Sequence, residues 1–283
     1  MKVVLATCRP KPGLTPGDGL LAASLRELGA TAVAAPWDTI PAASEDGVVC
    51  LRSTWDYHLR WSEFKEWVRA FREPRRLWNP PSTVLWNADK IYLRDLAAAG
   101  VALPRTRWFE PGERPAVPRL LEEWGASRAI LKPRVSATAY CTHVVSHDRE
   151  IEESDWAALE RSGSLLQGFV PEIQSRGEIS LVFLEGAFAH AVLKRPRPGD
   201  FRVQMDFGGS LKPTSPTDST IAFGAAVLVA AARPWLYARV DLVETDAGPV
   251  LMELELIEPD LFLTPQAAAR LAAGLIRSLE EMG

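Results

Sequence analysis

The sequence predicts a mixed α/β protein that becomes α+β in its second part. Over about the first 85 residues, apolar runs typical of buried strands alternate with patterns typical of helices. From about residue 86 onward, strand-like runs follow one another across short turns that contain glycine, which indicates antiparallel hairpins. A chain of 283 residues is long enough for two or three packed units. We therefore expect an N-terminal βαβ domain over residues 1–85 and a second region over residues 86–283.

The N-terminal region is expected to form a parallel sheet covered by helices. The segment GLLAASLRELGA (19–30) has leucines at helical spacing and ends near Gly29, and FKEWVRAFRE (64–73) has the apolar stripe of an amphipathic helix. Three aliphatic runs read as the strands of the sheet: VVLAT (3–7), TAVAAPW (31–37) and GVVCLRS (47–53). Strands that alternate with helices in this way indicate βαβ units and parallel pairing.

The second region is expected to begin with one helix from about Val84 to Ala99, which ends at Gly100. Single strands are predicted at ILKP (130–133), THVVS (142–146) and LLQGFV (165–170), and further helices near 150–162, 218–232 and 265–282. Two hairpins are predicted from paired apolar runs: EISLVFLEG (178–186) with AFAHAVLKR (187–195), and YARVDLV (237–243) with PVLMELELI (249–257).

The composition excludes several classes of protein. A formal net charge of −4 argues against a nucleic-acid-binding protein, which normally carries a surplus of Lys and Arg. The three cysteines, Cys8, Cys50 and Cys141, form neither a disulfide framework nor a CxxC pair, so a reducing compartment fits best. The apolar runs at the N-terminus and after Ile221 are too short for a signal peptide core or a membrane span. We expect a cytoplasmic protein without a nucleic-acid or membrane partner.

Acidic residues in the second hairpin indicate a cation site. Glu253 and Glu255 lie on one face of the predicted strand in LMELELIEPD, and they repel each other unless water or a cation separates them. Hairpin pairing places Asp241, from the otherwise apolar VDLV, beside these glutamates. Oxygen ligands of this kind suit Mg²⁺, which prefers few carboxylates together with phosphate oxygens and water. The alternative is an ordinary solvated sheet face.

Basic residues that could hold a phosphate lie upstream of the acids. Lys132 ends a strand directly before the small-residue loop VSATA (135–139), whose backbone N–H groups could approach phosphate oxygens although the loop lacks glycine. Lys90 lies early in a predicted helix, and Lys194 and Arg202 belong to a basic cluster that could neutralise a transferring phosphoryl group. Each of these cations also fits a plain surface position.

The order of these pieces resembles the ATP-grasp superfamily of ligases, and glutathione-synthetase-like members in particular. The resemblance covers about residues 85–283, and the preceding βαβ part resembles the pre-ATP-grasp domain of the superfamily. It implies a central nucleotide-binding subdomain over about 105–170 and a C-terminal subdomain over about 171–283. The segments that carry it are NADK (87–90), LKP (131–133), LLQGFV (165–170), GEISLVF (177–183), GDFRVQ (199–204), VDLV (240–243) and MELE (252–255).

The resemblance implies ATP and Mg²⁺ (or Mn²⁺) as cofactors and a role for each matching residue. Lys90, Lys132 and Ser136 would contact the phosphates, while Lys194 and Arg202 would stabilise the γ-phosphoryl group and an acyl phosphate. The remaining roles are an adenine hinge at Gln167, Phe169 and Val170, a ribose contact at Glu178, and metal ligands at Asp241, Glu253 and Glu255. Two departures from the family pattern are a Glu-x-Glu where Glu-x-Asn is usual, and a phosphate loop without glycines.

The segment LRSTWDYHLRW (51–61) is the candidate substrate site. It follows the third strand of the βαβ domain, and ligands in open α/β sheets bind outside the carboxyl ends of strands. Arg52 could pair with a substrate carboxylate and Asp56 with an ammonium group, with Ser53 and Thr54 beside them. The alternative is a capped loop whose aromatic residues pack on the core. The segment also resembles the corresponding part of ATP-grasp cyclo-ligases of cycloserine biosynthesis.

The function that follows is an ATP-dependent carboxylate–amine ligase. ATP would phosphorylate the carboxylate of an amino-acid-like or small-peptide substrate, and an amine of the same or another molecule would then attack the acyl phosphate. Two alternatives remain open, a phosphotransferase of the same fold and a nucleotide-binding protein without ligase activity. The oligomeric state is also open, with a homodimer as one option because the superfamily often forms dimers.

Overall fold

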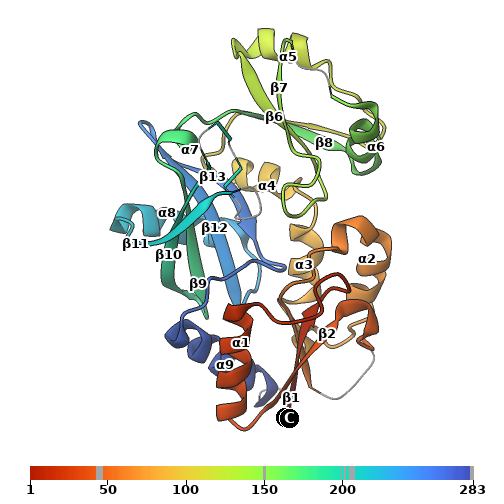
Figure 1. The fold of residues 1–283 in the computed structure, drawn as a ribbon, viewed down its shortest axis with the longest axis vertical. Helices are drawn as coiled ribbons and strands as arrows, with labels where there is room; N and C mark the ends of the chain where they lie inside the picture. The colour runs from red at the N-terminus through yellow and green to blue at the C-terminus, as the bar shows by residue number, and fades with distance from the viewer. Residues whose placement is uncertain (43–46, 149–150, 198, 201, 204–207, 281–283) are drawn as a thin grey trace.

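The computed structural model describes residues 1–283 apart from 43–46, 149–150, 198, 201, 204–207 and 281–283. Phe201 and Gln204 of the GDFRVQ segment, and the last residues of the predicted C-terminal helix, therefore lie outside the described residues. Three sheets form within the described ranges, and each belongs to a different part of the chain (Figure 1). No helix among the described residues is both long enough and apolar enough to cross a membrane.

The N-terminal sheet is parallel, as predicted, with the strand order β2-β1-β3-β4. Its strands are β1 (Lys2–Thr7), β2 (Thr31–Pro36), β3 (Val48–Leu51) and β4 (Leu77–Trp78). Helix α1 (Pro16–Glu27) crosses from β1 to β2, and Thr15 caps its N-terminus by accepting a hydrogen bond from the Asp18 N–H. Short 3₁₀ turns at Trp37–Thr39, Tyr57–Arg60 and Pro74–Arg76, and helix α2 (Trp61–Arg69), complete this part.

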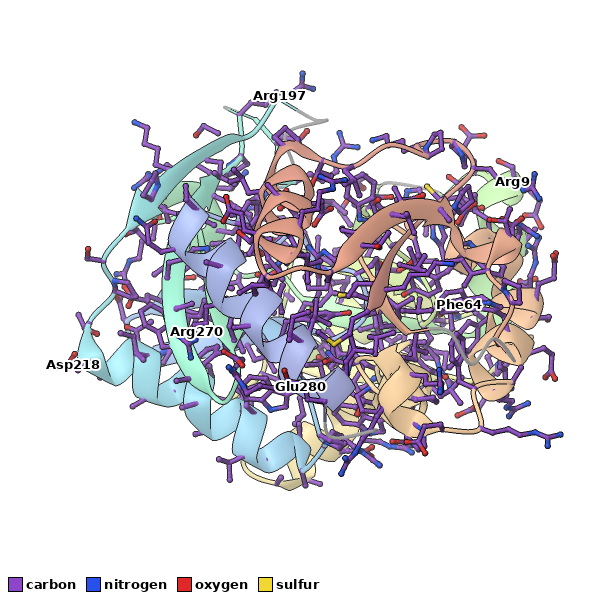
Figure 2. All side chains as sticks on the ribbon, turned by 90° about the horizontal axis from the view of Figure 1, so that it is seen from below. Arg9, Phe64, Arg197, Asp218, Arg270 and Glu280 are labelled. Atoms are coloured by element: carbon purple, nitrogen blue, oxygen red, sulfur yellow. The ribbon has the colours of Figure 1, made fainter. Side chains whose placement is uncertain are left out.

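Both faces of this sheet are buried because successive side chains of a strand point to opposite sides. Val3 and Leu5 of β1 pack in one core with α1 and the C-terminal helix α9 (Pro265–Glu280). Val4 and Ala6 pack on the other side with Phe64 of α2. Figure 2, seen from below, shows α9, which carries the labelled Arg270 and Glu280, running alongside α1. The C-terminal helix α9 thus completes the hydrophobic core of the N-terminal sheet.

The helix predicted over Val84–Ala99 is two helices, α3 (Pro81–Asn87) and α4 (Tyr92–Ala98), so the prediction of one continuous helix is wrong. Tertiary hydrogen bonds explain the break. The Asn87 side chain donates to the Leu254 carbonyl and accepts from the Leu256 N–H, and the Lys90 N–H donates to the Arg134 carbonyl. The chain therefore turns between the two helices where these partners lie.

A second sheet, antiparallel and ordered β5-β8-β6-β7, forms the upper part of Figure 1. Its strands are β5 (Thr106–Phe109), β6 (Arg128–Pro133), β7 (His143–Ser146) and β8 (Ser164–Gly168). Helices α5 (Val117–Trp124) and α6 (Glu153–Ser162) pack with it around Leu131 and Leu166. Strand β5 and helix α5 were not predicted from the sequence. A short helix, α7 (Glu172–Ser175), follows β8.

The third sheet is antiparallel and has the order β11-β10-β9-β12-β13. It contains both predicted hairpins, formed by β9 (Glu178–Leu184) with β10 (Ala187–Arg195) and by β12 (Tyr237–Thr245) with β13 (Gly248–Glu255). Strand β11 (Ser210–Thr214) adds an unpredicted edge. Helix α8 (Asp218–Ala231) approaches β9 closely at Gly224, where a Cβ atom would lie 2.5 Å from Leu181 Cδ1.

Candidate active site

A cavity of about 370 Å³ lies where side chains of the two antiparallel sheets meet loop residues of the N-terminal part of the chain. Its wall includes ends of β6 and β8, parts of β9, β10, β12 and β13, and the segment that follows β3. The structure brings to this cavity every residue that the sequence analysis assigned to ATP, Mg²⁺ or phosphoryl charge: Lys90, Lys132, Ser136, Gln167, Phe169, Val170, Glu178, Lys194, Arg202, Asp241, Glu253 and Glu255. The structure shows that these residues line one cavity, while the role of each residue in binding ATP, Mg²⁺ or the phosphoryl group stays a prediction.

The acids of the β12–β13 hairpin lie side by side. Asp241 is directly opposite Glu253 in the strand register, as the sequence predicted. Asp241 is buried and accepts hydrogen bonds from Ser180 Oγ at 2.5 Å, Lys194 Nζ at 3.1 Å and Arg239 Nη2 at 2.9 Å. Burial opposes ionisation, but the charges of Arg239 and Lys194 hold the pKa of Asp241 well below its usual range. Asp241 is therefore a fully compensated anion.

The negative charges of Glu253 and Glu255 are less completely neutralised by nearby cations than the charge of Asp241. Glu253 pairs with Lys90 Nζ at 3.1 Å, and Lys90 and Lys132 lower its pKa against the effect of burial. Glu255 contacts Arg239, yet burial raises its pKa to about 7, with Asp241 and Glu253 adding to the rise. An excess of negative charge thus remains at Glu255, on the wall of the cavity.

We tested whether these residues fit a magnesium ion. Within the described ranges, no group of three or more His, Cys, Asp or Glu residues is arranged to hold a metal ion. The Arg239 and Lys194 contacts occupy Asp241, which explains why three acids do not form a closed cluster. Glu253 and Glu255 are 31% and 27% exposed toward the cavity and offer only oxygen ligands. Two carboxylates fit Mg²⁺ when phosphate oxygens and water supply its other ligands.

Arg239 is the site residue that the sequence analysis missed. It lies two positions before Asp241 on β12, so both side chains point to the same face. Its guanidinium contacts Asp241 and Glu255 and donates to the Asp260 carbonyl at 3.1 Å. The available signal was an arginine inside the buried run YARVDLV, which requires a nearby anion.

The predicted phosphate contacts are two lysines, Lys90 buried and Lys132 half-buried. Lys90 is 5% exposed and donates from Nζ to the Ser136 carbonyl at 2.8 Å, besides its pairing with Glu253. Lys132 has no ion-pair partner among the residues that the structure describes, and loss of solvent around its ammonium group lowers its pKa. A half-buried ammonium group on a cavity wall is available for an anionic ligand.

The loop between β6 and β7 takes a conformation usually supplied by glycine. Thr138, Ala139 and Cys141 have positive φ angles of 50°, 56° and 47°. A left-handed backbone costs an L-residue about 1–2 kcal/mol, so other contacts must hold the loop. Arg134 is one such contact, since its guanidinium donates to Asp89 at 2.7 Å and to Glu110 at 2.9 Å. The lack of glycine therefore does not prevent a loop with left-handed residues.

The opposite end of the cavity is apolar. Phe169, Val170 and Ile173 belong to a small core with Val203 and Val243, and the Arg128 guanidinium stacks over the Phe169 ring at 3.7 Å from its centroid. Glu178, at the start of β9, pairs with Lys194 at 2.5 Å, and burial raises its pKa. An apolar slot next to polar groups is typical of sites for small organic ligands.

The two predicted catalytic cations differ in their surroundings. Lys194 is 7% exposed and lies between the carboxylates of Glu178 and Asp241. Arg202 is 32% exposed and pairs with Asp200 at 2.9 Å, next to residues outside the described ranges. Both line the cavity, but Lys194 pairs with two buried carboxylates from other strands, while Arg202 pairs with Asp200, two residues earlier in the sequence.

The structure does not bring the predicted substrate residues Arg52, Ser53, Thr54 and Asp56 to the cavity wall. Arg52 is buried, and it donates to Asp18 at 2.6 Å and to the Pro259 carbonyl at 3.0 Å. Asp56 accepts a hydrogen bond from the Trp37 indole at 2.8 Å. The neighbouring Trp55 and Tyr57 do line the cavity. Contact of the four polar residues with a substrate stays a prediction. The observed side-chain partners of Arg52 and Asp56 belong to the protein itself, whereas the buried hydroxyl groups of Ser53 and Thr54 have no hydrogen-bond partner among the described residues.

Comparison with known proteins shows where this architecture belongs. The chain is 31% identical over 275 residues to the cycloserine biosynthesis protein DcsG of Streptomyces lavendulae, which covers 90% of this chain and 91% of that protein. The family described as D-cycloserine synthetase DcsG, N-terminal domain, matches residues 3–79. This chain belongs to the DcsG family of ATP-grasp ligases. It is accordingly an ATP-dependent ligase.

Solved structures agree with this assignment. The crystal structure of D-cycloserine synthetase DcsG superimposes with a TM-score of 0.83 at 27% identity and covers 98% of this chain and 100% of that chain. D-alanine–D-alanine ligase from Bacillus anthracis gives a TM-score of 0.68 at 16% identity, covering 100% and 99%. The ATP-grasp ligase PsnB, solved with a minimal precursor, Mg and ADP, gives 0.62 at 14%, covering 98% of both chains. The predicted ATP-grasp fold is confirmed.

Proposed function

We propose that this DcsG-family ligase joins a carboxylate to an amine through an acyl phosphate, either within one molecule or between two. The observation that carries the proposal is the shared cavity, whose wall holds the cations Lys90, Lys132 and Lys194 together with the acids of the β12–β13 hairpin. Such a set of cations can hold the phosphates of ATP and absorb the charge that develops when phosphate is transferred.

The positions of the side chains support a division of the cavity between two ends. Lys132, which lacks an ion-pair partner among the described residues, and Lys90 would bind phosphate oxygens together with the loop at Ser136. Phe169 and Val170 would contact adenine, with Gln167 beside them. Glu178 would accept hydrogen bonds from ribose hydroxyls if its pairing with Lys194 loosens when nucleotide binds.

Glu253 and Glu255 would hold Mg²⁺. Asp241, which pairs with Lys194, would add its negative charge to the electrostatic field at the ion. When bound, the ion would neutralise part of the negative charge on the phosphate oxygens. The second glutamate, Glu255, stands where relatives usually have asparagine and adds one negative charge to this site, although burial raises its pKa to about 7.

The proposed reaction has two chemical steps, phosphoryl transfer to the carboxylate and attack of the amine on the acyl phosphate. A substrate carboxylate oxygen attacks the γ-phosphorus of ATP, and the bond to the β-phosphate oxygen breaks to release ADP. Lys194 and Arg239 lie where they can stabilise the negative charge on the transferred phosphoryl group. The amine nitrogen then attacks the acyl carbon, the bond from that carbon to phosphate breaks, and the nitrogen loses a proton. The products are an amide, phosphate and ADP.

A small amino-acid-like substrate fits this proposal. The relatives are named for the synthesis of D-cycloserine and for the joining of two D-alanines, so both handle amino-acid compounds. Cys8 and Cys50 are buried free thiols, and Cys141 is a partly exposed free thiol. Free thiols are compatible with the cytoplasm, where we place the protein.

The proposal is tested by incubating the protein with ATP, Mg²⁺ and single amino acids, with and without hydroxylamine. We expect ADP release that depends on one class of carboxylate, and a hydroxamate when hydroxylamine traps the acyl phosphate. A stable phosphorylated product that resists hydroxylamine would instead indicate a phosphotransferase. Absence of ATP binding, measured by calorimetry, would contradict the proposal altogether.

A further inference from the structure

The cavity wall carries a further buried carboxyl group, that of Glu258, to which no role in the nucleotide site is assigned. It follows β13 and directly precedes Pro259, in the last part of the acidic segment LMELELIEPD. The residue is 9% exposed and lines the same cavity as the proposed ATP site. Its chemical role is therefore independent of the residues that would hold ATP and Mg²⁺.

Glu258 differs from the four acids of the proposed nucleotide and metal site in having no ion pair among the described residues. Each of those four has one or more cations within ion-pair distance: Glu178 with Lys194, Asp241 with Arg239 and Lys194, Glu253 with Lys90, and Glu255 with Arg239. Among the described residues, the Glu258 carboxylate has no ion pair, and its hydrogen-bond donor is its own backbone N–H. A buried carboxylate without a cation is costly unless a ligand supplies one.

Electrostatics agree with this geometry. Burial raises the pKa of Glu258 to about 8, and the nearby Glu255 adds to the rise more than Lys90 opposes it. Burial raises the pKa of the Tyr57 phenol, and the nearby carboxylate of Glu258 adds to the rise. The environment of Glu258 thus has an excess of negative charge and one apolar, aromatic side.

The backbone that carries Glu258 is held rigidly against the N-terminal domain. The Trp55 indole donates to the Glu258 carbonyl at 3.3 Å, and the buried Arg52 donates to the Pro259 carbonyl at 3.0 Å. Lys11 lies over the Trp55 ring at 4.8 Å from its centroid and also lines the cavity. This end of the cavity therefore combines a buried carboxyl group without an ion pair among the described residues, an aromatic wall and the cation of Lys11, which suits a zwitterionic ligand.

We propose that Glu258 binds the ammonium group of an amino-acid substrate and selects it over substrates that lack this group. The inference rests on the proposed ligase function, because it names the substrate class for the same cavity. Arg52 and Trp55 act as positioning residues that hold the Glu258 backbone in place. An ammonium group of the substrate would form the ion pair with the Glu258 carboxylate that no described residue of the protein supplies.

The test compares binding of matched pairs of acids that differ only in the group at C2. Each α-amino acid, in both configurations, is paired with its 2-hydroxy analogue, for example alanine with lactate and serine with glycerate. Binding is measured by calorimetry in the presence of Mg²⁺ and a non-hydrolysable ATP analogue, so that no turnover is needed. The wild type should bind at least one amino acid about 30-fold more tightly than its hydroxy analogue, because removing one partner of a buried charge pair has a large effect.

Three variants make the result specific. Glu258→Gln should reduce the preference for the amino member to about threefold or less, while the affinity for the ATP analogue stays unchanged. Glu258→Asp keeps the charge and should restore part of the preference. Glu122→Gln, which removes an exposed carboxylate from α5, is the matched control and should behave as the wild type.

The outcomes separate this inference from the proposed function. A wild type that prefers no amino member, or a Glu258→Gln variant that keeps the preference, would overturn the role of Glu258. If a hydroxamate still formed in either case, the ligase proposal would stand alone. Amino-acid selectivity that depends on Glu258, without any hydroxamate, would support the binding role and count against ligase chemistry.

Discussion

The β12–β13 hairpin and the segment 51–60 both place charged residues in apolar surroundings, but they use them differently. In the hairpin, Glu253 and Glu255 face the cavity and take their counter-charges from Lys90 and Arg239. In the segment, the charge of Arg52 is turned inward and satisfied by Asp18. The same kinds of residue therefore face a cavity in one region and form a closed ion pair within the protein in the other.

The difference teaches which observation separates a ligand site from a structural ion pair. The Arg52–Asp18 pair is closed on itself, with side chains only 2% and 3% exposed. The hairpin acids keep exposed surface on the cavity and an unbalanced charge, visible in the pKa of Glu255 at about 7. A candidate ligand site is therefore recognised by charged groups that face a cavity and are not fully neutralised by the protein, and not by residue type alone.

The largest expected effect comes from replacing Arg239 with methionine, because this removes the cation shared by Asp241 and Glu255. Breaking a buried ion pair by removing one partner costs about 3–5 kcal/mol of unfolding free energy, and losing a group that stabilises developing charge lowers kcat about 100- to 1000-fold. Urea unfolding and the hydroxamate assay measure the two effects. Arg94→Met on the exposed face of α4 is the control, and wild-type turnover in Arg239→Met would remove Arg239 from the chemistry.

Replacing Arg52 with methionine should destabilise the fold by about 3–5 kcal/mol as well, but without changing the KM for ATP. The reason is that Asp18 would be left buried without its partner, far from the proposed nucleotide end. A second change, Asp18→Leu, should recover much of the lost stability in the double variant. A raised KM for ATP with unchanged stability would show that Arg52 takes part in ligand binding and is not a purely structural residue.

A smaller effect concerns the pH dependence of stability through His58, also in the segment 51–60. Burial, with help from Lys90, lowers the pKa of His58 to about 4 from an ordinary value near 6.5. Because the unfolded chain binds this proton more readily, the unfolding free energy should fall as the pH drops from about 6.5 to about 4, by up to about 3 kcal/mol. Equilibrium unfolding across this range measures the slope.

In His58→Gln this contribution is absent, so stability should depend less on pH in the same interval. The exposed His147→Gln is the matched control and should keep the wild-type slope. An identical slope in the wild type and in His58→Gln would show that the buried histidine is not responsible.

The smallest effect is expected at the apolar end of the cavity. Phe169→Ala should raise the KM for ATP about 5- to 10-fold, or about 1 kcal/mol, because an aromatic contact and the stacked Arg128 would be lost. Phe169→Tyr keeps the ring and should stay near the wild type. Steady-state kinetics at saturating amino acid would reveal the change, and an unaltered KM in Phe169→Ala would exclude Phe169 from the adenine contact.

Much of the local structure could be predicted because it depends on periodicity within a segment. The period-two pattern around Glu253 and Glu255 predicted β13, and the turn ETDAG predicted the hairpin that places Asp241 opposite Glu253. The helix over 84–99 was predicted as continuous because the break depends on partners such as Leu254 and Arg134, which lie far away in the sequence.

The sequence by itself determined most of the strands and helices and the residue types that a phosphate and cation site needs. Only the tertiary structure decided that Arg239 bridges two acids, that Arg52 turns inward to Asp18, and that Glu258 has no ion pair among the described residues. The physical reason is that hydrophobic periodicity is a property of neighbouring residues, whereas the charge balance of a buried group depends on which distant side chains the fold brings within a few ångströms of it.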